Sequence, residues 1–204
     1  MATLYLMRHG QTLFNQLNLI QGWCDSPLTA DGIAQAKTAY DYFSSQNITF
    51  DKIYSSTSER SCDTCELASG RTDYTRVKGL KEFNFGRMEG QPEFLHPETN
   101  VEGDFADYYV QFGGESQTAF SDRVIGTIQE IMASNQNQKT ILMTAHAGTL
   151  ISFYQFVTKQ FQSGFRPSNC CILKLSYQEG KFKLLEVIDP VDWSNKVKEA
   201  ESND

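Results

Sequence analysis

Cysteine is scarce in this sequence, and long apolar runs are missing. Five cysteines are scattered over 204 residues, whereas small disulfide-stabilised domains use an even and denser set. No apolar run approaches the roughly 20 residues that a membrane-spanning helix needs, and no charged-then-apolar leader opens the chain. We therefore expect reduced thiols in a soluble, cytoplasmic protein that does not bind a membrane.

Positive charge is also in short supply. The chain has 18 Lys and Arg against 25 Asp and Glu, which gives a formal net charge of -7. Nonspecific binding to nucleic acid needs an excess of basic residues, so we expect no nucleic-acid partner. The length and a hydrophobic content of 40% suit one well-buried core. We predict a single domain over residues 1–204.

Metal-binding patterns are almost absent. Cys62 and Cys65 form the one C-x-x-C motif, and neither a second such motif nor a pair of closely spaced histidines accompanies it. Because residues three apart share a helix face, we predict that these cysteines are small apolar residues of a helix that follows Ser56. No carboxylate cluster suited to magnesium is visible either. We predict that the protein uses no metal and no cofactor.

Patterns typical of strands and of helices alternate along the chain. Short apolar runs predict strands at residues 4–7, 52–55, 74–77, 140–144, 170–175 and 181–188. Periodic apolar residues between them predict helices, which indicates a doubly wound α/β fold with a mostly parallel central sheet and helices on both faces. The last two predicted strands are joined by so short a turn that they must form an antiparallel pair.

Two helix starts can be predicted in detail. Thr29 is a suitable cap for a helix with one apolar stripe facing the sheet: Ile33, Ala36, Tyr40 and Phe43. The S-x-x-E sequence from Ser56 to Glu59 is typical of a capping box. It places Arg60 in the first turn of the next helix, where backbone N–H groups and the helix dipole favour an anion.

Arg8 and His9 stand side by side at the carboxyl end of the first predicted strand. Open α/β sheets have their ligand sites at this edge. A guanidinium offers a planar set of donors for phosphate oxygens, and a neutral imidazole offers a nitrogen that can attack phosphorus or move a proton. The pair indicates phosphoryl chemistry, although such a pair also suits a solvated sheet edge.

Residues 88–114 lack clear periodicity and are rich in aromatic side chains. Long irregular segments in compact domains often act as lids or binding loops, so we predict that this segment is a lid or insertion over the active site. The alternative is that its aromatic residues pack into a satellite core. His96, which precedes Pro97 in this segment, is predicted to be a surface histidine.

Further residues follow Arg8 and His9 in a characteristic order. Arg60 follows the second strand, Glu82 lies in a loop after the third, and His146 follows the strand at 140–144. Shorter motifs accompany them: Asn15, Gln21-Gly22-Trp23, Leu28-Thr29-Ala30-Asp31-Gly32, Glu89-Gly90 and Gly113-Gly114-Glu115-Ser116. Over roughly residues 1–160 this set resembles the histidine phosphatase superfamily. The resemblance implies a phosphoglycerate mutase-like fold.

The resemblance also implies a role for each of the five main residues. His9 is expected to be the nucleophile that becomes transiently phosphorylated, and Glu82 the general acid and base. Arg8, Arg60 and His146 are expected to donate to the phosphoryl oxygens. These roles are chemically consistent, because His9 must be uncharged to attack and nearby guanidiniums disfavour imidazolium.

Two points in this set stay open. Glu89 and Glu115 also resemble family positions, so either could approach the site in place of Glu82. The sequence Ala145-His146-Ala147 departs from the usual Ser-His-Gly of the family. The hydrogen bonding of His146 is therefore expected to differ in detail.

Four more residues are candidates for binding the substrate. Asn15 and Gln21 could donate to phosphoryl oxygens or fix their own loop. Gly22 is a candidate as well, with a turn as the simpler explanation. Arg87 could meet an acidic group of the substrate, and a salt bridge on the surface is the alternative.

Three functions are compatible with these residues. The leading hypothesis is a metal-independent phosphatase that hydrolyses small phosphomonoesters through a phosphohistidine. A phosphoglycerate mutase is the first alternative, although family mutases usually carry an additional basic segment where this chain offers only Arg87. A noncatalytic phospholigand-binding module is the second. We expect a small phosphorylated metabolite as the partner, while the sequence leaves open both its identity and whether the protein is a homodimer.

Overall fold

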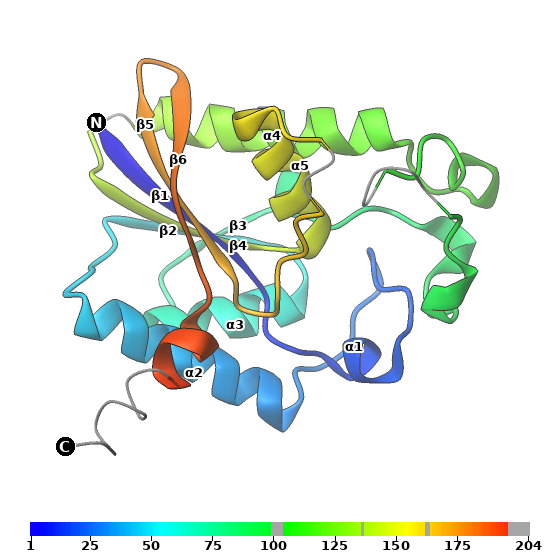
Figure 1. Ribbon diagram of the computed structural model, residues 1–204, viewed down its shortest axis with the longest axis horizontal. Coiled ribbons are helices and arrows are strands. Elements are labelled where there is room, and N and C mark those ends of the chain that lie inside the picture. The colour runs from blue at the N-terminus through cyan, green and yellow to red at the C-terminus, as the bar shows by residue number, and fades with distance from the viewer. Residues whose placement is uncertain (99–103, 136, 162–163, 196–204) are drawn as a thin grey trace.

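The computed structural model describes residues 1–98, 104–135, 137–161 and 164–195, and their strands form a six-stranded sheet in the order β3-β2-β4-β1-β5-β6 (Figure 1). The strands are β1 (Ala2–Arg8), β2 (Lys52–Ser56), β3 (Thr75–Val77), β4 (Thr140–Ala145), β5 (Ile172–Gln178) and β6 (Lys181–Ile188). The helices are α1 (Leu13–Leu17), α2 (Ala30–Ser45), α3 (Glu59–Ser69), α4 (Gln117–Ser134) and α5 (Ala147–Thr158). Short 3-10 helices are η1 (Lys78–Leu80), η2 (Gly86–Met88), η3 (Glu93–Leu95) and η4 (Val110–Phe112).

The strand directions confirm the predicted architecture. β1 pairs in parallel with β4, β4 with β2, and β2 with β3, whereas β5 is antiparallel to both β1 and β6. β4 lies between β1 and β2 and is buried along almost its whole length, as its continuous apolar sequence predicts. Because β2, β4 and β1 are adjacent and parallel, their carboxyl ends meet at one edge of the sheet.

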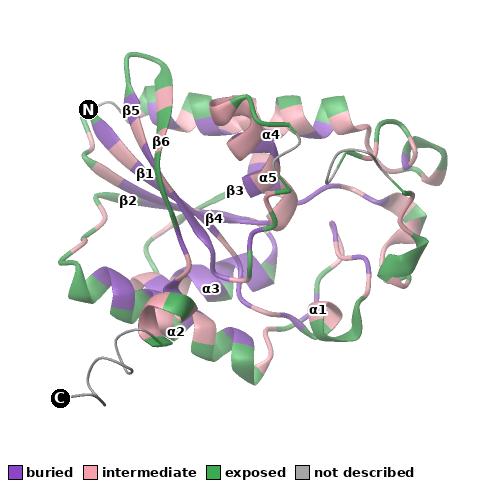
Figure 2. Cartoon of the chain, viewed as in Figure 1, coloured by how far each residue is buried: buried purple, intermediate pink, exposed green. Residues whose placement is uncertain are grey.

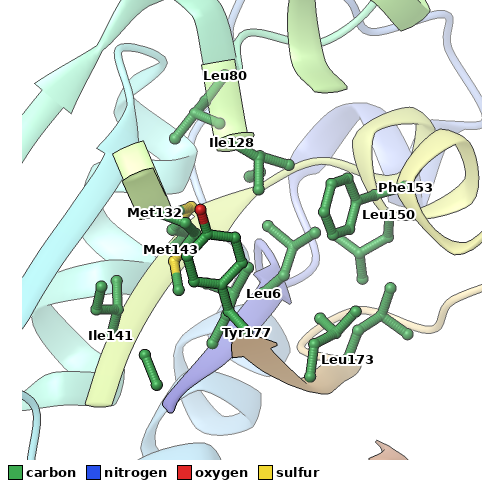
Figure 3. Packing of buried hydrophobic residues seen from close by; sticks show 14 of the residues in the cluster. Leu6, Leu80, Ile128, Met132, Ile141, Met143, Leu150, Phe153, Leu173 and Tyr177 are labelled. Carbon is green, nitrogen blue, oxygen red and sulfur yellow. The ribbon is translucent and has the colours of Figure 1, made fainter. Parts of the chain in front are cut away.

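Helices cover both faces of the sheet. α4 and α5 pack on one face, and α2 and α3 pack on the other (Figure 1). Side chains of β1 alternate between the two cores: Leu4 and Leu6 lie on the side of α4 and α5 (Figure 3), and Tyr5 and Met7 lie on the side of α2 and α3. Burial is therefore concentrated on the central strands β1, β4 and β5 and on the inner faces of the helices (Figure 2).

The buried face of α2 differs from the predicted one. The Thr29 hydroxyl caps the helix, as expected, by accepting the N–H of Gly32 at 3.0 Å. The prediction for Ile33 and Tyr40 is wrong, since these residues are 38% and 44% exposed. The buried residues are Gly32, Ala36, Ala39, Tyr42 and Phe43. The small side chains of the two alanines allow close packing, so the face is centred on them instead of on the bulkiest residues.

The capping box predicted from Ser56 to Glu59 is wrong. Ser58 is the N-cap of α3, and its side chain makes no capping bond. Ser56 is still in β2, paired with Val77 of β3, and its hydroxyl bonds a histidine of the site described below. Arg60 nevertheless lies in the first turn of α3, as predicted.

Cys62 and Cys65 lie on the predicted helix, whereas Cys170 and Cys171, predicted to begin a strand, precede β5. Cys62 and Cys65 are buried on α3, and all five cysteines are unpaired. Among the described residues, no helix is both long enough and apolar enough to cross a membrane.

Four aromatic residues of the predicted lid, residues 88–114, belong to a satellite core, whereas Phe94 is 83% exposed. Tyr109 is fully buried with Phe83, Phe85 and Phe120, and Phe105 packs against the same group. The described part of the segment thus packs as a satellite core, and because Glu93, His96 and Phe105 also line the cavity described below, the lid stays a prediction. Residues 99–103 of the predicted lid lie outside the described residues.

The difference in burial between two leucines predicts that the same substitution lowers the free energy of unfolding by different amounts. Leu6 has no exposed surface, whereas Leu185 on β6 is 48% exposed. Leu6→Ala is expected to lower the free energy of unfolding by about 2–5 kcal/mol, because it leaves a cavity between packed layers. Leu185→Ala is expected to cost less than about 1 kcal/mol. Urea unfolding measures both, and equal losses would contradict this packing.

Candidate active site

The carboxyl ends of three neighbouring parallel strands each supply a polar side chain. His9 follows β1, His146 follows β4 as the N-cap of α5, and Ser56 ends β2. The backbone N–H of His9 donates to the carbonyl of Ala145 at 3.0 Å, which ties the ends of β1 and β4 together. The rings of His9 and His146 consequently lie edge to face, with their centroids 5.3 Å apart.

The hydrogen bonding of His9 determines which ring nitrogen is available. Its Nδ1 lies 2.8 Å from the carbonyl oxygen of Gly10. A carbonyl oxygen only accepts, so Nδ1 carries the proton and the neutral ring keeps a lone pair on Nε2. Burial first, and then the positive charges of Arg60 and Arg8, lower the pKa of His9 well below its ordinary value. His9 is therefore an uncharged imidazole near neutral pH.

His146 is the opposite tautomer. Its Nδ1 lies 3.1 Å from Nη2 of Arg60, and a guanidinium only donates. The proton of the neutral ring is thus on Nε2, which donates to the hydroxyl of Ser56 at 2.8 Å. Burial and the charge of Arg60 lower the pKa of His146 well below its ordinary value. Both ring nitrogens are engaged within the protein, which differs from the expectation that His146 donates to a phosphoryl group.

Arg60 is fully buried, and its charge is paired with Asp25. Nη1 donates to the Asp25 carboxylate and to the carbonyl of Cys24, both at 2.9 Å, and Nη2 donates to the carbonyl of Gly22 at 2.8 Å. Asp25 also accepts the backbone N–H of Glu59 at the start of α3. The anion that the first turn of α3 was expected to attract is therefore supplied by the protein itself.

Arg8 has an unpaired donor beside His9. Its Nη1 donates to the carbonyl of Pro167 at 2.7 Å, whereas its buried Nε has no partner among the described residues. A buried donor without an acceptor is costly unless a ligand satisfies it. Nε of Arg60 is unpaired in the same way.

Glu82 is a buried carboxyl group held by two backbone donors. Oε1 accepts the N–H of Phe83 at 2.9 Å, and Oε2 accepts the N–H of Gly148 in the first turn of α5 at 3.0 Å. Burial raises the pKa of Glu82, while these two N–H groups and the charges of Arg60 and Arg8 oppose the increase. The group is thus suited to hold a proton at a pH where an exposed glutamate has lost it.

These residues surround a cavity of about 360 Å³, within the range of small-molecule sites. Its polar lining residues are Arg8, His9, Asn15, Gln21, Glu82, Glu93 and His96. Arg60 and His146 lie behind this lining, fully buried. The first turn of α5 contributes Ala147 and Gly148, which places the positive end of a helix dipole at the cavity.

Asn15 and Gln21 line the cavity but also hold their own loop. Asn15 Oδ1 accepts from the N–H of Thr12, and Gln21 bonds the hydroxyls of Thr12 and Ser26. Gly22 lies outside the lining, and a Cβ there would come within 2.1 Å of the Phe83 carbonyl. Glycine at this position therefore permits a close approach of two backbone segments.

Three other candidates lie away from the cavity. Arg87 donates to the carbonyl of Gln111 at 3.3 Å on an exposed 3-10 helix. Glu89 accepts the N–H groups of Trp23 and Cys24, and Glu115 pairs with Arg123. Of the three acidic candidates for the general acid, only Glu82 lines the cavity.

Sequence comparison assigns the chain to a family. A sequence model of the histidine phosphatase superfamily (branch 1) matches residues 4–190. The chain belongs to this superfamily. It is also 30% identical over 190 residues to a probable phosphoglycerate mutase GpmB of Yersinia pestis (strain Pestoides F), which covers 88% of this chain and 86% of the relative. The predicted family is thereby confirmed.

Solved structures of superfamily members have the same fold. The phosphoglycerate mutase from Bacillus anthracis str. Sterne matches with a TM-score of 0.81 at 26% identity, covering 97% of this chain and 96% of that one. The phosphoserine phosphatase from Entamoeba histolytica, in complex with 3-phosphoglyceric acid, matches with a TM-score of 0.77 at 26% identity, covering 92% and 96%. The fold is phosphoglycerate mutase-like, as predicted, and both mutases and phosphatases share it.

The prediction of a surface position for His96 is wrong. His96 lines the cavity, its ring stacks on Phe105 with centroids 5.0 Å apart, and its Nδ1 bonds the hydroxyl of buried Tyr109. The segment after η3 folds back over the satellite core, and no local pattern in the sequence indicates this.

The sequence analysis also misses two residues that hold the histidines of this site in place. Ser56 accepts from His146, and Asn169 donates to the carbonyl of His9 at 3.1 Å and to Asn15 at 3.3 Å. The position of Ser56 at the end of a parallel strand could have indicated that it belongs to the site.

In the described part of the chain, no group of three or more metal-ligating side chains occurs.

The buried, uncharged imidazoles make stability depend on pH with a defined sign. Histidine in the unfolded chain has a pKa of about 6.5. The pKa values of His9 and His146 are lower when folded, so the unfolded state binds more protons below that pH. The free energy of unfolding is therefore expected to be at its full value above about pH 6.5 and to fall as the pH decreases.

His146→Gln removes one of these protonation sites. The fall in unfolding free energy below pH 6.5 is expected to be shallower by up to about 1.4 kcal/mol per pH unit, measured by urea unfolding at pH 7.5, 6.5 and 5.5. Glu82, whose raised pKa gives the opposite sign, is common to both proteins and cancels in the comparison. An unchanged pH dependence in the variant would show that His146 is not held uncharged.

Proposed function

We propose that the protein is a phosphatase that hydrolyses small phosphomonoesters through a phosphohistidine on His9. The observation that carries this proposal is that His9, with its Nδ1 bonded to the Gly10 carbonyl, and the buried carboxyl group of Glu82 line one cavity. Membership of the superfamily supports it, because the phosphohistidine mechanism is general there. The expected partner is a small phosphorylated metabolite.

In the first half-reaction, Nε2 of His9 attacks phosphorus and the bond from phosphorus to the alcohol oxygen breaks. Glu82 gives its proton to the departing oxygen, so the alcohol leaves neutral and the carboxylate remains. The Gly10 carbonyl keeps the proton on Nδ1 and accepts a stronger hydrogen bond as charge develops on the ring. His9 is then phosphorylated.

In the second half-reaction, the Glu82 carboxylate takes a proton from water as the water oxygen attacks phosphorus. The bond between phosphorus and Nε2 breaks, inorganic phosphate leaves, and the electron pair returns to His9. Glu82 is protonated again, and the enzyme is ready for another cycle. One carboxyl group thus serves both steps.

Arginines supply the positive charge that phosphoryl transfer needs. Arg8 lines the cavity with a buried, unpaired Nε–H, which favours a contact with phosphoryl oxygens. We propose that Arg60, which lies behind the cavity lining, adds to this positive charge. His146 is proposed to position Arg60 through the 3.1 Å hydrogen bond between its Nδ1 and Nη2 of Arg60. Asn15 and Gln21 are proposed to add neutral donors, while Arg87 is proposed to act only on substrates that extend beyond the cavity. The proposal includes no metal ion.

Hydrolysis is favoured over the two alternatives by the residues around the phosphoryl position. Arg87 does not line the cavity, so the described residues offer no second cation to grip the carboxylate of a phosphoglycerate. A binding module needs arginines for phosphate but no attacking ring and no proton donor.

We also propose that residues 1–204 act as one domain and that the segment 88–114 forms part of the substrate site.

Two variants test the chemistry. His9→Ala is expected to abolish acid-labile, base-stable labelling of the protein by a radioactive phosphomonoester and to lower turnover by at least about 10³-fold. Glu82→Gln is expected to lower turnover by about 10²–10⁴-fold while still binding substrate, because it cannot donate a proton to the leaving oxygen. Rapid-quench labelling and steady-state kinetics with benzyl phosphate measure both effects.

Glu130→Gln is the matched control, because Glu130 is exposed on α4 and lies outside the cavity lining. Labelling that persists in His9→Ala would remove His9 as the nucleophile. Full activity in Glu82→Gln would reassign the general acid. Isomerisation of phosphoglycerate faster than phosphate release would favour the mutase.

A glycine pair tests the position of Glu82. A Cβ on Gly148 would lie 2.4 Å from Oε1 of Glu82, whereas a Cβ on Gly126 of α4 meets nothing within 4 Å. Gly148→Ala is therefore expected to displace the carboxyl group and to lower turnover of benzyl phosphate by about 10²-fold. Gly126→Ala should retain wild-type turnover. Equal activity of the two variants would show that the Glu82 position is not critical.

A further inference from the structure

Beyond His9, the cavity has a wall of aromatic and apolar side chains. Phe85, His96, Phe105, Phe120 and Ile151 all line it. The rings are fixed by their neighbours, since His96 stacks on Phe105 and bonds the buried Tyr109. A rigid wall of this kind can bind an apolar group with little loss of side-chain freedom.

Charge is unevenly distributed over the same cavity. Arg8 is the only cationic side chain that lines it in the described part of the chain, and a phosphoryl group would use that charge. Glu93, at the start of η3, lines the cavity as well. Burial raises the pKa of Glu93, and the nearby charge of Arg8 opposes the increase. A second anionic group on a substrate would meet this carboxyl group without a cation to offset it.

We infer that the substrate is a phosphomonoester of an uncharged, largely apolar alcohol, and that Glu93 disfavours alcohols that carry a carboxylate. This inference rests on the proposed phosphatase function and names the class of substrate that it takes. The aromatic wall accepts the alcohol portion, and the phosphoryl group lies at Arg8 and His9. Glu93 is exposed at the cavity mouth, and like charges about 4 Å apart near a protein surface still repel strongly enough for about a tenfold change in specificity.

Two substrate pairs test the two parts of the inference. Benzyl phosphate and 4-carboxybenzyl phosphate differ by one carboxylate on the same ring. Wild-type kcat/KM is expected to favour benzyl phosphate by at least about tenfold. Benzyl phosphate and glycerol 3-phosphate differ in the polarity of an uncharged alcohol, and benzyl phosphate should again have the higher kcat/KM.

Glu93→Gln tests the residue that we assign. It removes the charge and keeps the shape, so the preference against 4-carboxybenzyl phosphate should fall to less than about threefold. Glu130→Gln is the matched control, because Glu130 is exposed on α4 and outside the lining. The control should keep the wild-type preference and the wild-type kcat/KM for benzyl phosphate.

The failure of this inference is distinguishable from that of the proposed function. Wild-type protein that hydrolyses both benzyl substrates equally, or glycerol 3-phosphate faster than benzyl phosphate, would overturn the substrate class. An unchanged preference in Glu93→Gln would overturn the role of Glu93. The absence of both hydrolysis and His9 labelling with all three substrates would instead contradict the phosphatase itself.

Discussion

The bond from Arg60 to Nδ1 of His146 is the interaction on which the arrangement of the site depends. A guanidinium can only donate, so this bond fixes the tautomer of His146, directs its Nε2–H to Ser56 and opposes protonation of the ring. It connects α3 to the start of α5, and the same charge helps keep His9 neutral. Burial, and after it the charge of Arg60, thus keeps the proposed nucleophile uncharged.

A buried arginine is stable only where its charge and donors are satisfied. Asp25 supplies the charge, and the carbonyl groups of Gly22 and Cys24 accept two further hydrogen bonds. Glycine at position 22 permits this loop to approach the Phe83 carbonyl. The indole N–H of Trp23 donates to the carbonyl of Glu82 at 3.0 Å, which holds the loop against the segment that carries Glu82. The loop that neutralises the cation and the segment that carries the proposed acid are therefore fixed to one another, which gives both half-reactions a common geometry.

The parts of this structure that depend on local patterns could be predicted from the sequence. Strand-forming runs predicted the sheet and its antiparallel end, and polar residues after parallel strands indicated that His9 and His146 would lie together. The contacts that decide the details join residues far apart, such as Asp25 and Arg60, which are 35 positions apart. The same reason explains the cavity position of His96, which depends on how a patternless segment folds back. The hydrogen bonds of His146 also could not be predicted from the sequence, because a ring nitrogen accepts or donates according to its partner.

The central claim is that His9 and His146 are neutral rings of opposite tautomer. Nitrogen-15 NMR of histidine-labelled protein between pH 8 and pH 6 tests it most directly. We expect one ring with its proton on Nδ1 and one with its proton on Nε2, assigned by His9→Ala and His146→Gln, and neither should become an imidazolium in this range. Protonation of either ring with a midpoint near the ordinary histidine value would contradict the account.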